Sequence, residues 1–397
     1  MATRLDIGRL EEGQVLDDVE LTQAQAVALN SSQLVSVQPS TNGWKVTAAY
    51  AVGAIHCGGL SVRVDPKVGP LQVLHLLARA YGVEKLKIDA SLIGVDGLAE
   101  LTAVLAVLFA HEAATAIAAG VLRGYRTEDQ ALPVLRGRLR LRDQQLRRFG
   151  MLVPLEVTFD EWTTDTSENR RIRAACRCLM AMADVPKPAR DSLSRLDRLL
   201  VDVCLAPAGT VPAPWVPTRL NARLHRLLHL ADLVLDHAAV EHRVGDVKVH
   251  GFVLSMPWLF QRLVTQLLNE TGKPRGVGIR EQRLNLDDQK RLYIKPDLVF
   301  SDGVKEMAVA DTKYKLLDDK GKFPNADAYQ LVTYCARLGL KIGHLIYAAG
   351  DPLPEPYEIM GVGTRLVVHS VDMKQTVPEI EVQVRALFDK IAEGWMS

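Results

Sequence analysis

The stretch that decides the fold is Tyr293-Ile-Lys-Pro-Asp297-Leu-Val-Phe300, followed after a short turn-like segment by Ala310-Asp311-Thr-Lys313-Tyr-Lys315. Both stretches are typical of β-strands in which charged side chains interrupt apolar ones. Because side chains alternate between the two faces of a strand, Asp311 and Lys313 are predicted to share one face. If the two strands pair through the turn between them, Asp297 lies beside Asp311. The stretch therefore predicts a compact acidic pocket that contains one cation.

The side chains of this pocket suit a divalent metal ion. Asp297 and Asp311, together with the backbone carbonyl of Thr312, offer the oxygen ligands that Mg²⁺, or Mn²⁺ in its place, prefers. Such an ion would polarise a phosphate and lower the pKa of a bound water, while Lys313 would orient that water or stabilise the developing negative charge. The alternative is a buried Asp–Lys pair without chemistry. Burying three charges is costly, so the metal-site interpretation is favoured.

The length and net charge of the chain limit the number of domains and the kind of nucleic-acid binding that we expect. The chain has 397 residues, with 48 Lys and Arg against 47 Asp and Glu, a formal net charge of +1. This length predicts two or three domains, each with its own core. The near-neutral charge excludes a polybasic protein that binds nucleic acid by bulk charge alone, so any nucleic-acid site must be a local patch.

The cellular compartment is predicted from three further features. Apolar stretches such as Leu101–Ala110 are too short to span a membrane. The N-terminus lacks the basic, apolar and small-residue pattern of a signal peptide. The five cysteines are odd in number and scattered, which favours buried free thiols over disulfides or a metal site. We therefore expect a cytoplasmic protein without membrane contact.

The chain as a whole is predicted to be a mixed, multidomain α+β protein. Residues 1–80 contain short β-like runs and form a β-rich N-terminal module, and residues 81–206 form a mainly helical middle region. Four prolines within residues 207–218 predict a connector. Residues 219–397 begin with helical patterns and continue as strand, strand, helix, strand, which predicts an α/β core.

Arginines are concentrated between Arg123 and Phe149. This segment contains eight arginines and only three acidic residues. This segment is either a solvated face paired with neighbouring acids or a surface for nucleic acid or a partner protein, and the sequence does not decide between the two. The candidate DNA-binding residues within it are Arg136, Arg138 and Arg140. The Gly-rich basic turn Gly272–Gly278 adds Lys273 and Arg275 as candidates near DNA phosphate.

Pro296-Asp297 followed by Asp311-Thr-Lys313 resembles the signature of PD-(D/E)xK nucleases. Gln330 and Tyr334 support the resemblance, because many such nucleases carry a Gln and a Tyr one turn apart on the following helix, facing the site. More specifically, the chain resembles the McrC family, the nuclease subunit of McrBC-type modification-dependent restriction systems. Further segments that resemble this family are Val62–Lys67, Leu135–Arg138, Phe159-Asp-Glu-Trp with Glu168-Asn169 after it, and Met256–Phe260.

One position departs from the family pattern. The first helix of the nuclease core usually shows Leu-Phe-Glu, whereas this chain has Leu259-Phe260-Gln261. Gln261 would hold a metal-bound water through its amide oxygen, or Glu281 would approach from the next segment. For Glu281, the role of a solvated surface charge is favoured over a role beside the metal ion.

The resemblance implies a restriction-endonuclease-like α/β core and a Mg²⁺-dependent DNA endonuclease that is active mainly in a complex. It implies Asp297, Asp311 and Lys313 as catalytic residues, with Gln330, Tyr334 and Gln261 in support. It also implies two partners, a hexameric AAA+ GTPase of the McrB type, whose hydrolysis this subunit stimulates, and modified double-stranded DNA. The alternative is a catalytically silent DNA-binding adaptor that activates the motor.

Overall fold

The computed structural model describes residues 5–57, 59–82, 101–182, 185–205, 207, 210–244, 247–316, 324–350 and 355–396. The chain divides into two compact units. The first unit comprises Met1–Ile88, Val244–Val247 and Val253–Ser397, and the second comprises Asp89–Arg243 and Lys248–Phe252. Residues from the predicted N-terminal module therefore share a unit with residues of the predicted core, and the predicted connector belongs to the second unit. The predicted domain boundaries stay predictions.

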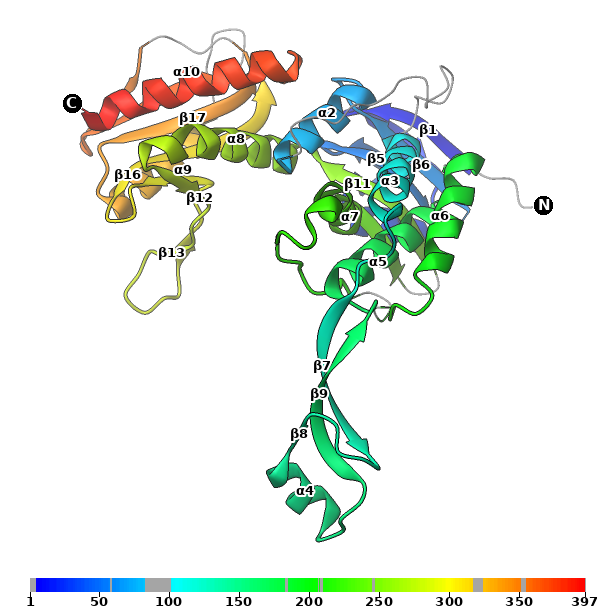
Figure 1. Ribbon diagram of the computed structural model, residues 1–397. Helices are drawn as coiled ribbons and strands as arrows, with labels where there is room; N and C mark the ends of the chain where they lie inside the picture. The colour runs from blue at the N-terminus through cyan, green and yellow to red at the C-terminus, as the bar shows by residue number, and fades with distance from the viewer. Residues whose placement is uncertain are drawn as a thin grey trace. The chain divides into compact units, whose positions relative to one another are not determined.

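Two small sheets build the N-terminal part of the first unit (Figure 1). In one sheet β6 lies between β1 and β5, parallel to β1 and antiparallel to β5. In the other sheet β4 lies between β2 and β3, and α1 contacts β3. The bounds are β1 (Leu5–Glu11), β2 (Val15–Val19), α1 (Gln23–Ser31), β3 (Val35–Ser40), β4 (Gly43–Ala48), β5 (Ala51–Cys57), β6 (Leu60–Asp65), α2 (Pro70–Ala80) and β11 (Val247–Ser255).

A six-stranded mixed sheet, in the order β12-β15-β16-β17-β19-β18, forms the rest of the first unit. Strands β15 and β16 are antiparallel, whereas β16, β17 and β19 are parallel. The elements are α8 (Met256–Gly272), the 3-10 turn η3 (Lys273–Arg275), β12 (Gly278–Arg280), β13 (Leu284–Asn285), β14 (Tyr293–Ile294), β15 (Leu298–Ser301), β16 (Glu306–Leu316), α9 (Asn325–Leu338), β17 (Ile342–Ala349), β18 (Tyr357–Ile359), β19 (Thr364–Ser370) and α10 (Val377–Met396).

Helices cover both faces of this sheet. Leu331, Tyr334 and Cys335 of α9 pack with Val309 and Leu345 in one buried apolar cluster. On the other face, α8 and α10 contact β16, and the ring of Phe300 lies 6.4 Å from that of Phe388. Because both faces are covered, β16 is buried at Ala308, Val309 and Ala310. The site described below therefore lies on a strand that is fixed from both sides.

The predicted mixed α/β organisation is confirmed. Strands β15, β16 and β17 and helix α9 form where the alternating and helical patterns predicted them, as do most strands of the β-rich N-terminal region. Within the predicted helical region of residues 81–206, α3 (Leu101–Ile117) forms, and residues 83–100 lie outside the described residues. None of the helices in the described ranges is long and apolar enough to cross a membrane.

The second unit is a group of helices from which a β arm projects (Figure 1). The remaining elements of this part of the chain are α3, β7 (Gly124–Leu132), β8 (Arg138–Leu139), α4 (Leu141–Arg148), β9 (Leu155–Thr163), α5 (Ser167–Ala181), α6 (Lys187–Leu199), the 3-10 turn η2 (Ala222–Leu224), α7 (His225–His237) and β10 (Ala238–Val244). Helix α5 contacts α6, α7 and α3. The described residues of the proline-rich segment form no helix or strand, and Arg171 donates to the carbonyl of Pro212.

The arm consists of β7 and β9, which pair antiparallel from Gly124–Thr163 to Leu132–Leu155, with β8 and α4 at the far end. Within residues 124–163 only α4 is helical, so the prediction of a mainly helical middle region does not hold there. Alternating residues there make cross-strand pairs, such as Thr158 with Asp129 and Thr127 with Asp160, which suit a two-stranded ribbon. The arginine-rich segment is thus part of a β arm.

Arg79 joins three helices of the first unit. This residue of α2 is buried and forms ion pairs with Glu270 of α8 and Glu381 of α10, the latter with Nε and Oε1 2.5 Å apart. The guanidinium group of Arg79 is planar and donates to Glu270 with both terminal nitrogens. Helix α2, from the N-terminal part, is therefore held against the helices of the six-stranded sheet.

We predict that Arg79→Met lowers the free energy of unfolding by roughly 2 kcal/mol, because two half-buried carboxylates lose their shared cation. The control is Arg385→Met, since Arg385 also contacts Glu381, at 3.6 Å, but its side chain is 65% exposed. An exposed pair of this kind contributes at most about 1 kcal/mol. Urea unfolding of both variants measures the difference, and equal losses would contradict the assignment.

Candidate active site

Strand β16 presents Asp311 and Lys313 on the same face, as the alternation of side chains predicted. Lys313 Nζ lies 2.5 Å from Asp311 Oδ2 as an ion pair, although this oxygen has no partner with hydrogen-bond alignment. Asp311 is 2% exposed and the Lys313 side chain 16% exposed. The structure therefore places one carboxylate and one ammonium group together at a nearly dry position.

Asp297 directly precedes β15 and lies beside this pair. Leu298 is paired with Ala310, so the register brings Asp297 next to Asp311, and a turn closed by Asp302 and Gly303 joins the two strands. Asp297 Oδ2 accepts from the Thr312 amide at 3.0 Å and from the Thr312 hydroxyl at 2.7 Å.

Strict alternation along β16 would place the Thr312 side chain on the face opposite Asp311 and Lys313, yet its hydroxyl contacts Asp297. Asp297 stands outside the paired residues of β15, so its side chain is free to turn towards Thr312. The position of Asp297 is thereby fixed by two donors on β16.

Helix α9 supplies the polar groups around Lys313. Gln330 Oε1 accepts from Lys313 Nζ at 2.8 Å, and Gln330 Nε2 donates to Tyr334 Oη at 2.5 Å. Tyr334 Oη in turn donates to the carbonyl of Lys295 at 3.3 Å. The predicted supporting residues Gln330 and Tyr334 therefore reach the site through a chain of hydrogen bonds.

Asp327 also belongs to this group, and the sequence prediction missed it. It is buried, accepts from Tyr347 Oη at 2.6 Å and from Lys315 Nζ at 3.1 Å, and lies 3.8 Å from Lys313 Nζ. The available signal was helical spacing, because residues 327, 330 and 334 fall on one face of α9. The site therefore contains three acids and two lysines instead of the predicted two acids and one lysine.

The electrostatics of the site are dominated by the burial of Asp311. Burial and the nearby charge of Asp297 raise the pKa of Asp311 to about 6, while Lys313 opposes the shift. Burial also raises the pKa of Tyr334 to about 12, so its hydroxyl keeps its proton as a donor. Lys313 thus compensates the charge of Asp311 incompletely, and a further cation beside Asp311 would be stabilising.

Gln261, on α8 where the acid was expected, contacts Glu281. Gln261 Nε2 donates to Glu281 Oε2 at 3.3 Å, and Lys295 Nζ lies 2.8 Å from Glu281 Oε1. Glu281 is exposed, in agreement with its interpretation as a solvated charge, but it is also paired. The structure thus brings together the two residues considered for the position of the first-helix acid.

A divalent ion fits this donor set. The carboxylates of Asp297 and Asp311 are hard oxygen ligands, and the buried Asp311 Oδ2 lacks an aligned hydrogen bond. Within the described ranges no group of three or more His, Cys, Asp or Glu side chains is placed to hold a metal. An ion held by two carboxylates and the Thr312 carbonyl would complete its coordination with water, as Mg²⁺ commonly does.

The predicted DNA-binding residues fall in two separate places. Arg136 and Arg138 are exposed on the arm, whereas Arg140 forms ion pairs with Asp129, Asp143 and Glu156. Lys273 and Arg275 lie on η3, both exposed. Arg275 pairs with Asp389 at 2.6 Å and stacks on Phe388. The ion pairs of Arg140 and Arg275 reduce the positive charge that these two residues can offer to phosphate.

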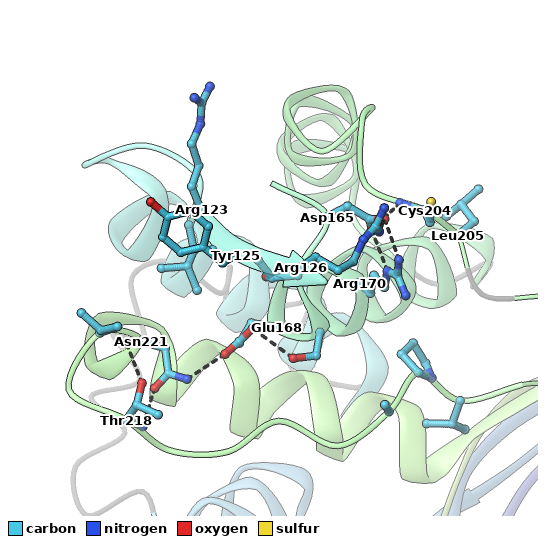
Figure 2. A pocket seen from close by; sticks show the side chains of 18 of the residues that line it. Arg123, Tyr125, Arg126, Asp165, Glu168, Arg170, Cys204, Leu205, Thr218 and Asn221 are labelled. Atoms are coloured by element: carbon cyan, nitrogen blue, oxygen red, sulfur yellow. Dashed lines mark hydrogen bonds and ion pairs between the residues drawn. The ribbon is translucent and has the colours of Figure 1, made fainter. Parts of the chain in front are cut away.

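A cavity of about 720 Å³ lies in the second unit, at the base of the arm (Figure 2). Several of its polar residues are paired with one another. Arg126 of β7 and Arg170 of α5 converge on buried Asp165, and Asn221 donates to Glu168 at 2.9 Å. The hydrogen bond from Arg170 keeps the pKa of Asp165 well below its usual value. This network holds the base of the arm to α5.

A comparison with models of known protein families finds a match, which covers most of the chain. The family model of the McrBC 5-methylcytosine restriction system component matches residues 46–348. No curated protein matches the sequence.

Two solved structures are similar. The first is a chain of the refined half-complex from a tetradecameric assembly of Thermococcus gammatolerans McrB AAA+ hexamers with bound McrC, at 20% identity and a TM-score of 0.60, covering 98% of this chain and 100% of that one. The second is a chain of the cryo-EM structure of the Thermococcus gammatolerans McrBC complex, at 21% identity and a TM-score of 0.45, covering 67% and 88%. The first similarity shows a shared fold.

The raised pKa of Asp311 predicts a stability effect. Between pH 3.8, the ordinary pKa of this carboxyl group, and about pH 6, the folded protein binds the proton of Asp311 more tightly than the unfolded chain does. The stability of the fold therefore falls as the pH rises through this range. Asp311→Asn removes the charge and is expected to raise the free energy of unfolding near pH 8 by about 2 kcal/mol. Urea unfolding in EDTA measures it, with the exposed Asp288→Asn as control. A variant less stable than the wild type at pH 8 would show that the Lys313 pair outweighs burial.

Proposed function

The chain belongs to the family of McrBC 5-methylcytosine restriction system components, and from this premise we propose that it is the nuclease subunit of a modification-dependent restriction complex. It would act as a Mg²⁺-dependent DNA endonuclease with a PD-(D/E)xK core. The observation that carries the proposal is the placement of Asp311 and Lys313 on β16 beside Asp297, which directly precedes the paired strand β15, with α9 packed against the sheet.

The chemistry assigned to the site is hydrolysis of a phosphodiester bond. Asp297, Asp311 and the Thr312 carbonyl would hold the metal ion. When bound, that ion supplies Lewis-acid polarisation of the phosphate and acidifies a bound water. The ammonium group of Lys313 would stabilise the negative charge that develops on the phosphoryl oxygens. Gln330 and Asp327 fix the position of Lys313, since both lie within 3.8 Å of its Nζ.

We further infer that this chain works with a hexameric AAA+ GTPase of the McrB type and stimulates its hydrolysis. The sequence contains no phosphate-cradling NTPase loop, so nucleotide-driven movement on modified DNA would come from another chain. The similar solved structure, an assembly of McrB AAA+ hexamers with bound McrC, supports this choice of partner.

The arm of the second unit is the best candidate for contact with this partner. Its far end exposes apolar side chains that a solvated ribbon would not need, above all Phe149 at 88% and Leu152 at 84% exposure. Others at the same end are Val134, Leu135, Leu141, Leu146, Met151 and Val153. The Asp165 network holds the base of the arm, so the tip would meet a partner in a fixed direction.

A catalytically silent adaptor is the second candidate function. The neutral Gln261 favours it, because this residue stands where the family pattern has an acid. An adaptor would stimulate the GTPase and bind DNA without cleaving it. Cleavage assays therefore separate the two candidates.

We predict that Asp311→Asn and Lys313→Ala each reduce DNA cleavage by roughly 10²-fold or more, because each removes one element of the metal and water arrangement. Stimulation of the partner GTPase should remain. The assay uses modified plasmid, partner, GTP and Mg²⁺, with the exposed Lys341→Ala as control and EDTA to remove the ion. The wild-type chain alone should cut poorly. Wild-type cleavage by either site variant would end the nuclease proposal.

The arm gives a separate prediction. Residues 1–88 share a compact unit with the nuclease core, so deleting the whole N-terminal region would also disturb the site. A variant that alters only the far end of the arm replaces residues 133–154 with an Asn-Gly turn. This turn can join β7 to β9 because Leu132 and Leu155 are already paired across the two strands. We expect loss of GTPase stimulation by this variant and by Phe149→Ser with Leu152→Ser.

The matched control for the arm is Leu199→Ser with Val201→Ser, which removes two exposed apolar side chains of the same unit outside the arm. GTP hydrolysis by the partner, titrated with each variant, is the measurement. Full stimulation by the shortened arm would place the contact elsewhere on the chain.

A further inference from the structure

The β13–β14 hairpin projects from the six-stranded sheet immediately before Asp297 (Figure 1). Leu284 pairs with Ile294 and Asn285 with Tyr293, and only Lys295 and Pro296 separate β14 from Asp297. The hairpin was not among the predicted site elements. Its root is therefore also the edge of the candidate active site.

The loop at the end of the hairpin, residues 286–292, has a defined conformation. Leu286 N donates to the Leu292 carbonyl at 2.9 Å, which closes the loop. Asp287 accepts from the Leu292 amide at 2.7 Å and pairs with Arg291 at 3.2 Å, so its carboxylate is used inside the loop. The residues presented outward at the tip include Lys290, which is exposed.

Helix α9 holds the hairpin at its base. Arg337 Nε donates to the Asn285 carbonyl at 2.6 Å, and Tyr334 Oη donates to the Lys295 carbonyl at 3.3 Å. The same helix carries Gln330, which accepts from Lys313. The hairpin and the Lys313 ammonium group are therefore positioned by one helix, and their spacing is fixed before any ligand binds.

The surface of the hairpin and its base is positively charged in a chain that is almost neutral overall. Its exposed basic side chains are Arg280, Arg283, Lys290, Arg291, Lys295 and Arg337. Three acids lie among them, and two form ion pairs, Glu281 with Lys295 and Asp287 with Arg291, so Arg280, Arg283, Lys290 and Arg337 stand outside these two pairs. Arg283 lies 3.9 Å above the ring of Tyr293, itself 55% exposed, which forms a flat cationic and aromatic face.

We propose that the β13–β14 hairpin is a DNA-contacting element that lies in the major groove of the duplex and holds the backbone so that one phosphate reaches Asp311 and Lys313. This inference rests on the proposed nuclease function and names the surface through which that site holds its substrate. A two-stranded β-ribbon fits the major groove, and flexible basic side chains at its edges contact phosphates without reading sequence. The lack of sequence reading suits a nuclease whose partner recognises the DNA.

The binding test compares two double variants. The hairpin variant carries Arg283→Ala and Lys290→Ala, and the control variant carries Lys341→Ala and Arg365→Ala. Each removes two exposed positive charges of the same unit. Lys341 and Arg365 lie at the start of β17 and β19, away from the strand ends that pair beside Lys313. Fluorescence anisotropy with the full chain, a fluorescent duplex and EDTA reports binding without cleavage. The hairpin variant should bind the duplex roughly fivefold more weakly than the wild type, or weaker still. The slope of log affinity against log salt concentration should become smaller by about 1 for each phosphate that the variant no longer neutralises.

Two further measurements keep the proposal testable if affinities are low or a variant is unstable. A photo-crosslinking p-benzoylphenylalanine at position 290 should attach to DNA in the complex with the partner, whereas the same residue at position 341 should not. Cleavage by the complex should need more DNA for half-maximal rate in the hairpin variant, whereas stimulation of the GTPase should be unchanged.

The outcomes separate the hairpin from the nuclease function itself. Weaker binding by the hairpin variant, together with crosslinking at position 290 in a wild-type complex that does not cleave, would support the hairpin and reject the nuclease. Equal binding by the hairpin and control variants, or crosslinking at position 341 alone, would overturn the hairpin assignment whether or not the complex cleaves.

Discussion

The incomplete compensation of Asp311 is the constraint on which the rest of the site depends. A carboxylate at 2% exposure is stable as an anion only with cations or donors around it, and Lys313 alone leaves its pKa raised to about 6. The surrounding residues limit what can move in response. Gln330 and Asp327 hold Lys313 from α9, and Thr312 holds Asp297 from the strand. The site is therefore rigid but short of positive charge, which is the condition that favours a bound cation.

The opposite face of β16 explains why the N-terminal residues share a unit with the core. Tyr314 alternates with Lys313, and its ring lies 6.1 Å from that of Tyr50 and 6.4 Å from that of Phe260. Glu12, a buried acid of the N-terminal part, accepts from the Lys67 amide. Burial, and after it the charge of Glu12, raises the pKa of the Tyr314 phenol. The strand that carries the candidate catalytic residues is thus supported by residues more than two hundred positions away in sequence.

The sequence predicted those parts of the site that follow from local periodicity. Alternation placed Asp311 with Lys313, the turn between two strands placed Asp297 beside them, and helical spacing placed Gln330 and Tyr334. Asp327 was missed because its partners Lys313, Lys315 and Tyr347 lie on two strands, so only the packing of α9 against the sheet brings it to the site. The β13–β14 hairpin was missed because its strands have two residues each, and β7 of the arm was missed because its sequence is mostly polar. In β9 the alternation of Leu155, Val157 and Phe159 was an available signal. Division of the chain into two discontinuous units depends on long-range packing that no local pattern encodes.

Gln261 fits the same charge balance. Its neutral amide adds no charge beside Glu281, whose own charge is offset by Lys295 at 2.8 Å. Under the proposed function, two carboxylates hold a divalent ion less tightly than three would, and a DNA phosphate would add the missing negative charge. Metal and substrate would then bind more strongly together than either alone, because each supplies the charge that the other needs.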